Sequence, residues 1–245
     1  SFATRGLVER LVREGRRGFV LDYTGVWWGL RSSRDGRGPG LPAVIFGGPH
    51  ADVALNEHAG GAIAEYIAAS DGWSIIDLDG LTPAQQQRFV TAFLQELYRL
   101  NKRPLHCVLE EIDEFCPMTS AAGAETMIGA VARVFQRGRV KGLRASAITQ
   151  RPANLHTRVR AQCNAIVLMK LMAPQDRKAV QDWVRGQADE EKGREVIDSL
   201  PQLARGEAWV WAPEQNILNR VTMPDIGTFD SMRTPKEGEI KAPRE

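Results

Sequence analysis

Two adjacent carboxylates, Glu110 and Glu111, end an apolar run, and Gln150 ends a second one. An apolar strand that delivers acidic residues at its carboxyl end places them in the crevice where open α/β sheets bind ligands. There the first carboxylate could hold Mg²⁺, directly or through water, and the second could orient or deprotonate an attacking water. The alternative is that the two glutamates only enter a solvated loop, and the short string does not separate these interpretations.

The elements that position these residues follow from the hydrophobic periodicity. Helical stretches alternate with short β-branched runs, which is typical of an α/β fold with a mostly parallel sheet and helices on both faces. We expect strands at 18–22, 43–46, 73–78, 105–111, 145–149 and 165–171, with 145–149 and 165–171 in the middle of the sheet, and a terminal hairpin at 208–211 and 217–223. We expect helices at 2–14, 52–69, 125–137, 174–184 and 189–200, and one from Thr82, where Gln85 completes a capping box.

The first helix is predicted to be amphipathic. Leu7, Val8 and Leu11 fall on one face, and Arg5, Glu9 and Arg13 fall on the opposite, solvent-facing one.

Composition limits the class of protein. The 245 residues include 43 % hydrophobic and 25 % charged residues, and no apolar run is long enough to cross a membrane. The net charge of +2 gives no global basic excess, so any nucleic-acid surface must be local. Three cysteines without C-x-x-C spacing, and no signal-peptide pattern, favour a cytoplasmic protein. We expect one domain over 1–230 and a polar, flexible tail over 231–245.

Five ordered segments together resemble the HerA/FtsK group of hexameric RecA-like motor ATPases, most closely the HerA branch. They are LEEIDEFCP (109–117), RGRVKG (137–142), ITQRP (148–152), QCNAIVLMKL (162–171) and SLPQLARGEA (199–208). The resemblance implies a RecA-like P-loop NTPase core that uses ATP and Mg²⁺ to move along DNA. It also implies a homo-hexameric ring with nucleotide between neighbouring subunits, no membrane association, and a nuclease or other effector as a possible partner.

The resemblance also assigns roles to residues. Glu110 and Glu111 occupy the Walker B positions, with Glu110 on the Mg²⁺ side and Glu111 as the catalytic base. Gln150 matches the polar sensor of the γ-phosphate or the lytic water. Arg139 and Arg137 fall in the segment that supplies an arginine finger to the neighbouring subunit, where a guanidinium neutralises charge on the transferred phosphoryl group. For either arginine, a solvated basic turn is the alternative.

Two features depart from the pattern of P-loop motors. Glu110 stands where those motors usually have Asp, and Mg²⁺ tolerates little misplacement of its ligands. The 245 residues contain no G-x-x-x-x-G-K-[ST] loop. Because Ser1 opens the first helix, it matches the last residue of that loop, whose hydroxyl would bind Mg²⁺; the alternative is an ordinary N-cap.

Two other functions stay open. A conjugative type IV secretion ATPase shares these motifs. A catalytically dead module could keep the fold to complete a ring or to dock a nuclease or effector, and the absent phosphate loop and Glu110 favour it, whereas Glu111, Gln150 and Arg139 argue against it.

Overall fold

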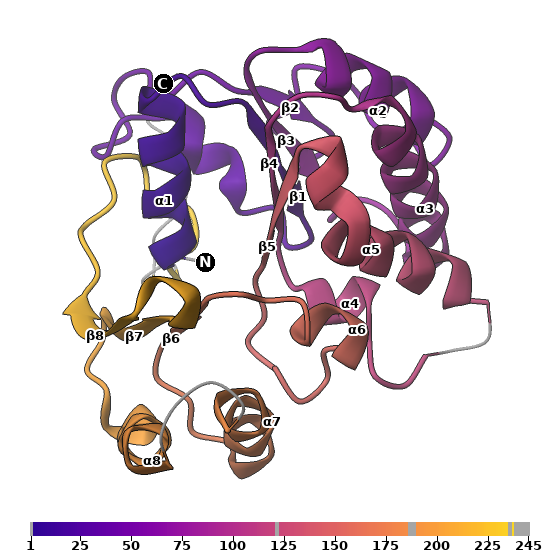
Figure 1. The fold of residues 1–245 in the computed structure, drawn as a ribbon. Coiled ribbons are helices and arrows are strands. Elements are labelled where there is room, and N and C mark those ends of the chain that lie inside the picture. The colour runs from indigo at the N-terminus through magenta and orange to yellow at the C-terminus, as the bar shows by residue number, and fades with distance from the viewer. Residues whose placement is uncertain (1, 121–122, 186–189, 235–236, 238–245) are drawn as a thin grey trace.

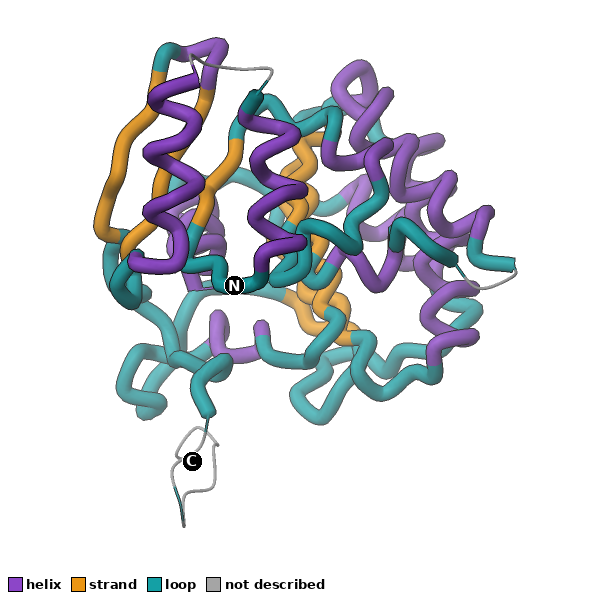
Figure 2. Tube along the Cα trace, turned by 90° about the horizontal axis from the view of Figure 1, so that it is seen from below, coloured by secondary structure: helices purple, strands orange, loops and turns teal. Residues whose placement is uncertain are grey.

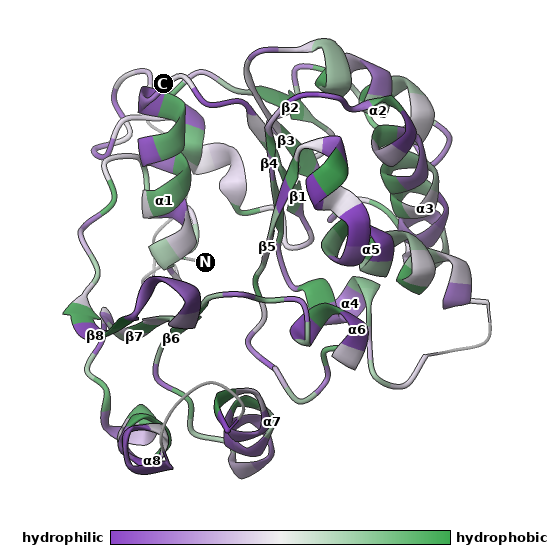
Figure 3. Ribbon diagram, in the orientation of Figure 1, coloured by the Kyte–Doolittle hydropathy of each residue, from purple (hydrophilic) through white to green (hydrophobic). Residues whose placement is uncertain are grey.

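Five parallel strands form the main sheet, in the order β2-β3-β1-β4-β5 (Figure 1). The computed structural model describes residues 2–120, 123–185, 190–234 and 237. The strands are β1 (Gly18–Asp22), β2 (Val44–Phe46), β3 (Trp73–Asp77), β4 (Leu105–Leu109) and β5 (Leu143–Ala147). All residues of β1 and β3 and all but His106 of β4 are buried, and the strands are predominantly hydrophobic in Figure 3. In β5 only Leu143 is buried. The predicted α/β class with a mostly parallel sheet is confirmed.

Helices cover both faces of this sheet. The helices α2 (Gly60–Ala69), α3 (Pro83–Leu100) and α5 (Glu125–Arg137) share one core with Phe19, Leu21 and the short α4 (Ile112–Phe115). On the other face, α1 (Phe2–Arg13) and the 3-10 helix Trp27–Arg31 pack on Val20 and Val108. The alternation of Phe19, Val20 and Leu21 between the two cores is the two-residue period of a strand covered on both sides.

The predicted start of α3 is confirmed. The Gln85 side-chain oxygen accepts the Thr82 backbone N–H at 2.9 Å. The predicted helix at 52–69 is shorter than expected, because its first residues do other work: the Asp52 carboxylate accepts the Ile45 N–H at 2.8 Å and binds Arg31. Val53 then bridges to Phe46, and α2 begins only at Gly60.

A second, antiparallel sheet carries the C-terminal part of the chain. Its strands β6 (Ile166–Leu168), β7 (Glu207–Ala212) and β8 (Ile217–Thr222) pack against α7 (Pro174–Val184) and α8 (Glu190–Ser199). Figure 2 shows α7 and α8 side by side at one end of the molecule. In the sequence, the short α6 (Thr157–Arg160) lies between β5 and β6. The remaining short 3-10 turns are Gly138–Lys141, Leu200–Gln202 and Pro213–Gln215.

The prediction that the strands at 145–149 and 165–171 lie in the middle of the main sheet is wrong for both. β5 is an edge strand, and β6 belongs to the second sheet, where it pairs antiparallel with β7. The apolar run of β6 is buried by Trp209, Trp211 and α8 rather than by helices on the main sheet. An apolar run indicates that a strand is buried, but it does not indicate which helices or strands bury it. The predicted terminal hairpin is confirmed as β7 and β8.

Of the three charged residues predicted on the solvent face of the first helix, only Arg13 is exposed. Arg5 and Glu9 are buried, whereas Leu7 is 47 % exposed. Arg5 donates to the Phe229 and Val26 carbonyls, both at 2.7 Å, and its guanidinium lies over the Trp27 ring. These partners are far away in the sequence, so the periodicity of the helix could not show them.

The C-terminal segment 226–231 lies along α1. Thr228 and Ser231 are buried, and Glu9 accepts the backbone N–H groups of Gly227 and Thr228 at 2.8 and 2.9 Å. Ser231 was expected to begin the flexible tail, yet it accepts a hydrogen bond from Arg5. Most of 231–245 lies outside the described residues, so the division at 230 stays a prediction.

Candidate active site

Carboxyl groups line the edge of the sheet where the strands β1, β3 and β4 end. Asp77 is the register partner of Asp22, and Glu110 follows directly on Leu109, which pairs with Leu21. The three carboxylates therefore end neighbouring strands at one level. This is the edge at which open α/β sheets bind ligands.

Glu110 is buried within this row. Its carboxylate is 1 % exposed and accepts the Thr24 hydroxyl at 3.0 Å. Burial and the adjacent Glu110 carboxylate raise the pKa of Asp22 well above its usual range, and Asp22 also accepts the Trp27 N–H at 2.8 Å. A neutral Asp22 beside Glu110 relieves the repulsion between two buried carboxylates. Sequence reasoning missed Asp22 and Thr24 as neighbours of Glu110.

Glu111 has a left-handed backbone conformation, with φ at 45°. Such a conformation in a residue other than glycine is strained by about 1 kcal/mol or more and clusters at functional sites. Its neighbours hold the bend: the Glu110 N–H donates to the Leu21 carbonyl at 3.1 Å, and the Ile112 N–H to the Ile148 carbonyl at 2.9 Å.

This bend aims Glu111 at Gln150, whose side-chain amide donates to Glu111 Oε1 at 2.5 Å. The structure thus joins two residues that the sequence predicted separately. Burial raises the pKa of Glu111, although the Gln150 hydrogen bond opposes the shift. A carboxylate with a raised pKa accepts a proton more readily, as a general base requires.

A second contact fastens the ends of β4 and β5 to each other. The Thr149 hydroxyl donates to Asp113 Oδ1 at 2.5 Å and accepts the Arg151 N–H at 2.8 Å. Asp113 is 5 % exposed, and its contact with Thr149 joins the segment after β4 to the segment after β5. Only the pairing of β4 with β5 brings the two residues together.

The donor set suits Mg²⁺. Among the described residues, no group of three or more His, Cys, Asp or Glu side chains is arranged to hold a metal ion alone. Mg²⁺ in nucleotide sites is held by one or two carboxylates together with phosphates and waters, and its preferred ligands are oxygens. Glu110 and the Thr24 hydroxyl offer such oxygens. Ser1, the other predicted Mg²⁺ ligand, lies outside the described residues.

Arg137 and Arg139 lie at the opposite edge of the sheet. They belong to the turn between α5 and the first residue of β5, whereas Glu111 and Gln150 follow the last residues of β4 and β5. At about 3.3 Å per residue, the five residues of β5 separate the two edges by roughly 16 Å. In one chain, therefore, neither arginine belongs to the site of Glu111.

Both arginine side chains are exposed, and within the described part of the chain neither makes a hydrogen bond or an ion pair. They are available to a partner.

No family model matches the chain. It is 30 % identical over 137 residues to the probable DNA double-strand break repair helicase HerA of Methanocaldococcus jannaschii, a match that covers 56 % of this chain and 24 % of the relative. The chain spans about a quarter of the length of the curated relatives it matches.

Solved structures share the fold. The genome packaging NTPase B204 of Sulfolobus turreted icosahedral virus 2, in complex with AMPPCP, matches with a TM-score of 0.56 at 9 % identity, over 91 % of this chain and 89 % of that chain. The plasmid coupling protein TrwB, in complex with a non-hydrolysable GTP analogue, matches with a TM-score of 0.51 at 16 % identity, over 71 % and 45 % of the two chains.

Proposed function

We propose that the chain is a HerA/FtsK-type RecA-like ATPase domain and that it hydrolyses ATP at the subunit interfaces of a homo-hexameric ring that moves along DNA. The similarity to the HerA helicase and the fold shared with B204 and TrwB support this proposal. The observation that carries this proposal is the contact between Glu111 and Gln150 beside the buried Glu110 at the carboxyl edge of the sheet. A water bound beside this pair would be the nucleophile that ATP hydrolysis requires.

Each residue of the site has one task in this mechanism. Glu110 would hold Mg²⁺, and the bound ion would supply positive charge to neutralise the phosphates. Glu111 accepts the proton of the attacking water, and Gln150 orients that water through its side-chain amide. Ser1, which lies outside the described residues, would supply a hydroxyl ligand to Mg²⁺.

The arginine finger completes the site from a second subunit. Arg139, with Arg137 beside it, lies roughly 16 Å from Glu111 in its own chain and is unpaired among the described residues, so we assign it to the neighbour's nucleotide. A positive charge on the transferred phosphoryl oxygens speeds related reactions by about 10³ to 10⁵. This division of the site between two chains supports a ring.

The wider setting is also part of the proposal. No helix among the described residues is both long and apolar enough to cross a membrane. The three cysteines are free thiols, as a reducing cytoplasm would keep them. We expect DNA as the track and a nuclease or another effector protein as partner, as in the HerA branch.

The decisive experiment measures ATP hydrolysis, with and without DNA, on the natural polypeptide that contains these residues. DNA-stimulated turnover is expected, and Glu111→Gln should abolish it while nucleotide binding persists, because only the proton acceptor is lost. Wild-type turnover in Glu111→Gln would remove Glu111 from the mechanism. A wild-type protein that folds and assembles but does not hydrolyse ATP would favour a catalytically dead scaffold.

A further inference from the structure

A buried asparagine ties the arginine-bearing turn to the body of the domain. Asn101, the residue after α3, is fully buried. Its side-chain amide donates to the Lys141 carbonyl at 2.6 Å and to the Arg103 carbonyl at 2.7 Å, and its oxygen accepts from Arg17 at 3.2 Å. Both N–H groups and the oxygen are therefore used, which fixes the orientation of the side chain.

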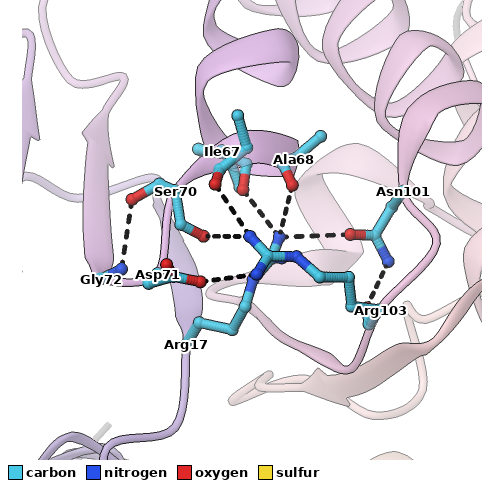
Figure 4. Close-up of polar contacts among 9 residues, drawn as sticks. Arg17, Ile67, Ala68, Ser70, Asp71, Gly72, Asn101 and Arg103 are labelled. Carbon is cyan, nitrogen blue, oxygen red and sulfur yellow. Dashed lines mark hydrogen bonds and ion pairs between the residues drawn. The ribbon is translucent and has the colours of Figure 1, made fainter.

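Arg17, Arg103 and the end of α2 form a frame around Asn101 (Figure 4). Arg17 donates to the Ile67 and Ala68 carbonyls, and Arg103 donates to the Ala69 carbonyl and pairs with Asp71. These carbonyls end α2, where a helix leaves its last acceptors unsatisfied and carries partial negative charge. Two guanidinium groups at this position anchor Asn101 to the end of α2.

The turn rests closely against this frame. Gly142 has a φ of +79°, and a Cβ atom there would lie 2.6 Å from the Arg103 carbonyl oxygen. The Lys141 ammonium lies 5.6 Å from the centre of the Tyr98 ring. The opposite side of the turn faces solvent: Val140 is 83 % exposed, and its neighbour Arg139 is exposed as well. The backbone of the turn is fixed, and its outward side chains are free.

From these contacts we infer that Asn101 is a positioning residue for the arginine finger: its amide holds the turn 137–141 so that Arg139 is presented to the nucleotide of a neighbouring subunit. The inference rests on the proposed function. A guanidinium on a fixed backbone stabilises developing charge with little rearrangement of the protein. A loose turn would first have to be ordered, which costs free energy. The role is distinct from catalysis, because Asn101 contacts the arginine-bearing turn only through the backbone carbonyl of Lys141.

The test uses Asn101→Asp in the natural full-length polypeptide. The substitution keeps the size and the oxygen that faces Arg17, but it replaces both N–H donors with an oxygen that meets two carbonyls. We expect kcat for ATP to fall by about tenfold or more, with KM changed by less than about twofold. Hydrogen exchange should accelerate at residues 138–142 but not in β1.

Subunit mixing separates positioning from simple damage. Asn101→Asp subunits retain Glu111, and Glu111→Gln subunits retain a well-held Arg139, so mixed rings contain intact interfaces and should recover turnover that neither variant has alone. Subunits that fail to fold would not be rescued in this way. Asp71→Ala is the matched control, since Asp71 belongs to the same frame but is 85 % exposed, and it should keep wild-type turnover.

Gly142→Ala provides an independent variant. Its Cβ pushes the turn away from Arg103 without touching Arg17 or α2, and the same rescuable loss of kcat is expected. A wild-type kcat in folded Asn101→Asp and Gly142→Ala would overturn the inference. So would a second result: Arg139→Ala and Glu111→Gln subunits recover turnover when mixed, but Asn101→Asp and Glu111→Gln subunits do not. If Arg139→Ala alone keeps full turnover, the failure belongs to the proposed arginine finger instead.

Discussion

Thr228→Val tests the contact that fastens the C-terminal segment to α1. The Thr228 hydroxyl is buried and donates to Glu9 Oε1 at 2.6 Å. The same carboxylate accepts the backbone N–H groups of Thr228 and Gly227. Valine has nearly the shape of threonine, so the substitution removes one hydrogen bond and opens no cavity.

The structure sets the size of the effect. A hydrogen bond to a charged group contributes about 1.5–3 kcal/mol to stability. Because two backbone donors remain on Glu9, its carboxylate stays partly satisfied and the cost falls in the lower half of that range, about 1.5–2 kcal/mol. For a domain of this size, each kcal/mol lowers Tm by about 2–4 °C, so we expect a decrease of about 3–8 °C.

Urea unfolding gives the free energy directly. The midpoint should move to lower urea with the slope m unchanged, which marks a change in stability rather than in the surface exposed on unfolding. Thr222→Val on β8 is the control, since Thr222 is exposed and its substitution should cost less than about 0.5 kcal/mol. Equal small losses for both variants would refute the buried contact between Glu9 and Thr228.

Two further predictions concern the core and the sheet. Burial and nearby Arg144 lower the pKa of His106, so the unfolded chain binds protons first below about pH 6.5. The free energy of unfolding should therefore fall between pH 7 and 5. Urea titrations at several pH values should show a smaller fall in His106→Gln than in the wild type, and equal falls in the two proteins would contradict the prediction. Phe93→Ala should lower the free energy of unfolding by about 3–5 kcal/mol, whereas exposed Gln95→Ala should lower it by less than about 0.5 kcal/mol. Thermal unfolding measures both, and similar Tm values for the two variants would contradict the buried position of Phe93.

The sequence predicted the candidate site residues from local patterns. Glu110 and Glu111 follow one apolar strand, and Gln150 follows another. Parallel pairing of β4 with β5 places the ends of both strands at one edge. The pattern did not reveal Thr24 or Asp22, because a threonine in a loop and an aspartate at a strand end have no spacing that marks them as partners of Glu110.

The errors share a physical cause. Arg5 and Glu9 were placed on a solvent face because charged residues are rarely buried without partners. Their partners, Phe229 and Thr228, come from more than 200 residues away, and only the tertiary fold brings them to α1. β6 was misplaced for a similar reason, since its apolar residues fit either sheet and long-range packing decides between them.

The two edges of the main sheet carry complementary chemistry. The carboxyl edge holds Glu110, Glu111 and Gln150, and the amino edge holds the exposed guanidinium groups of Arg137 and Arg139. β5 separates the two edges within one chain. Under the proposed function, the residues that act on one ATP therefore come from two copies. When the carboxyl edge of one copy contacts the amino edge of another, each copy keeps one edge free. Repetition of this contact closes a ring if the rotation between neighbouring copies permits it. Under the proposed function, the same contact that completes a catalytic site also builds the assembly, so a substitution that displaces the arginine turn should weaken hydrolysis at the neighbour's site and spare nucleotide binding at its own.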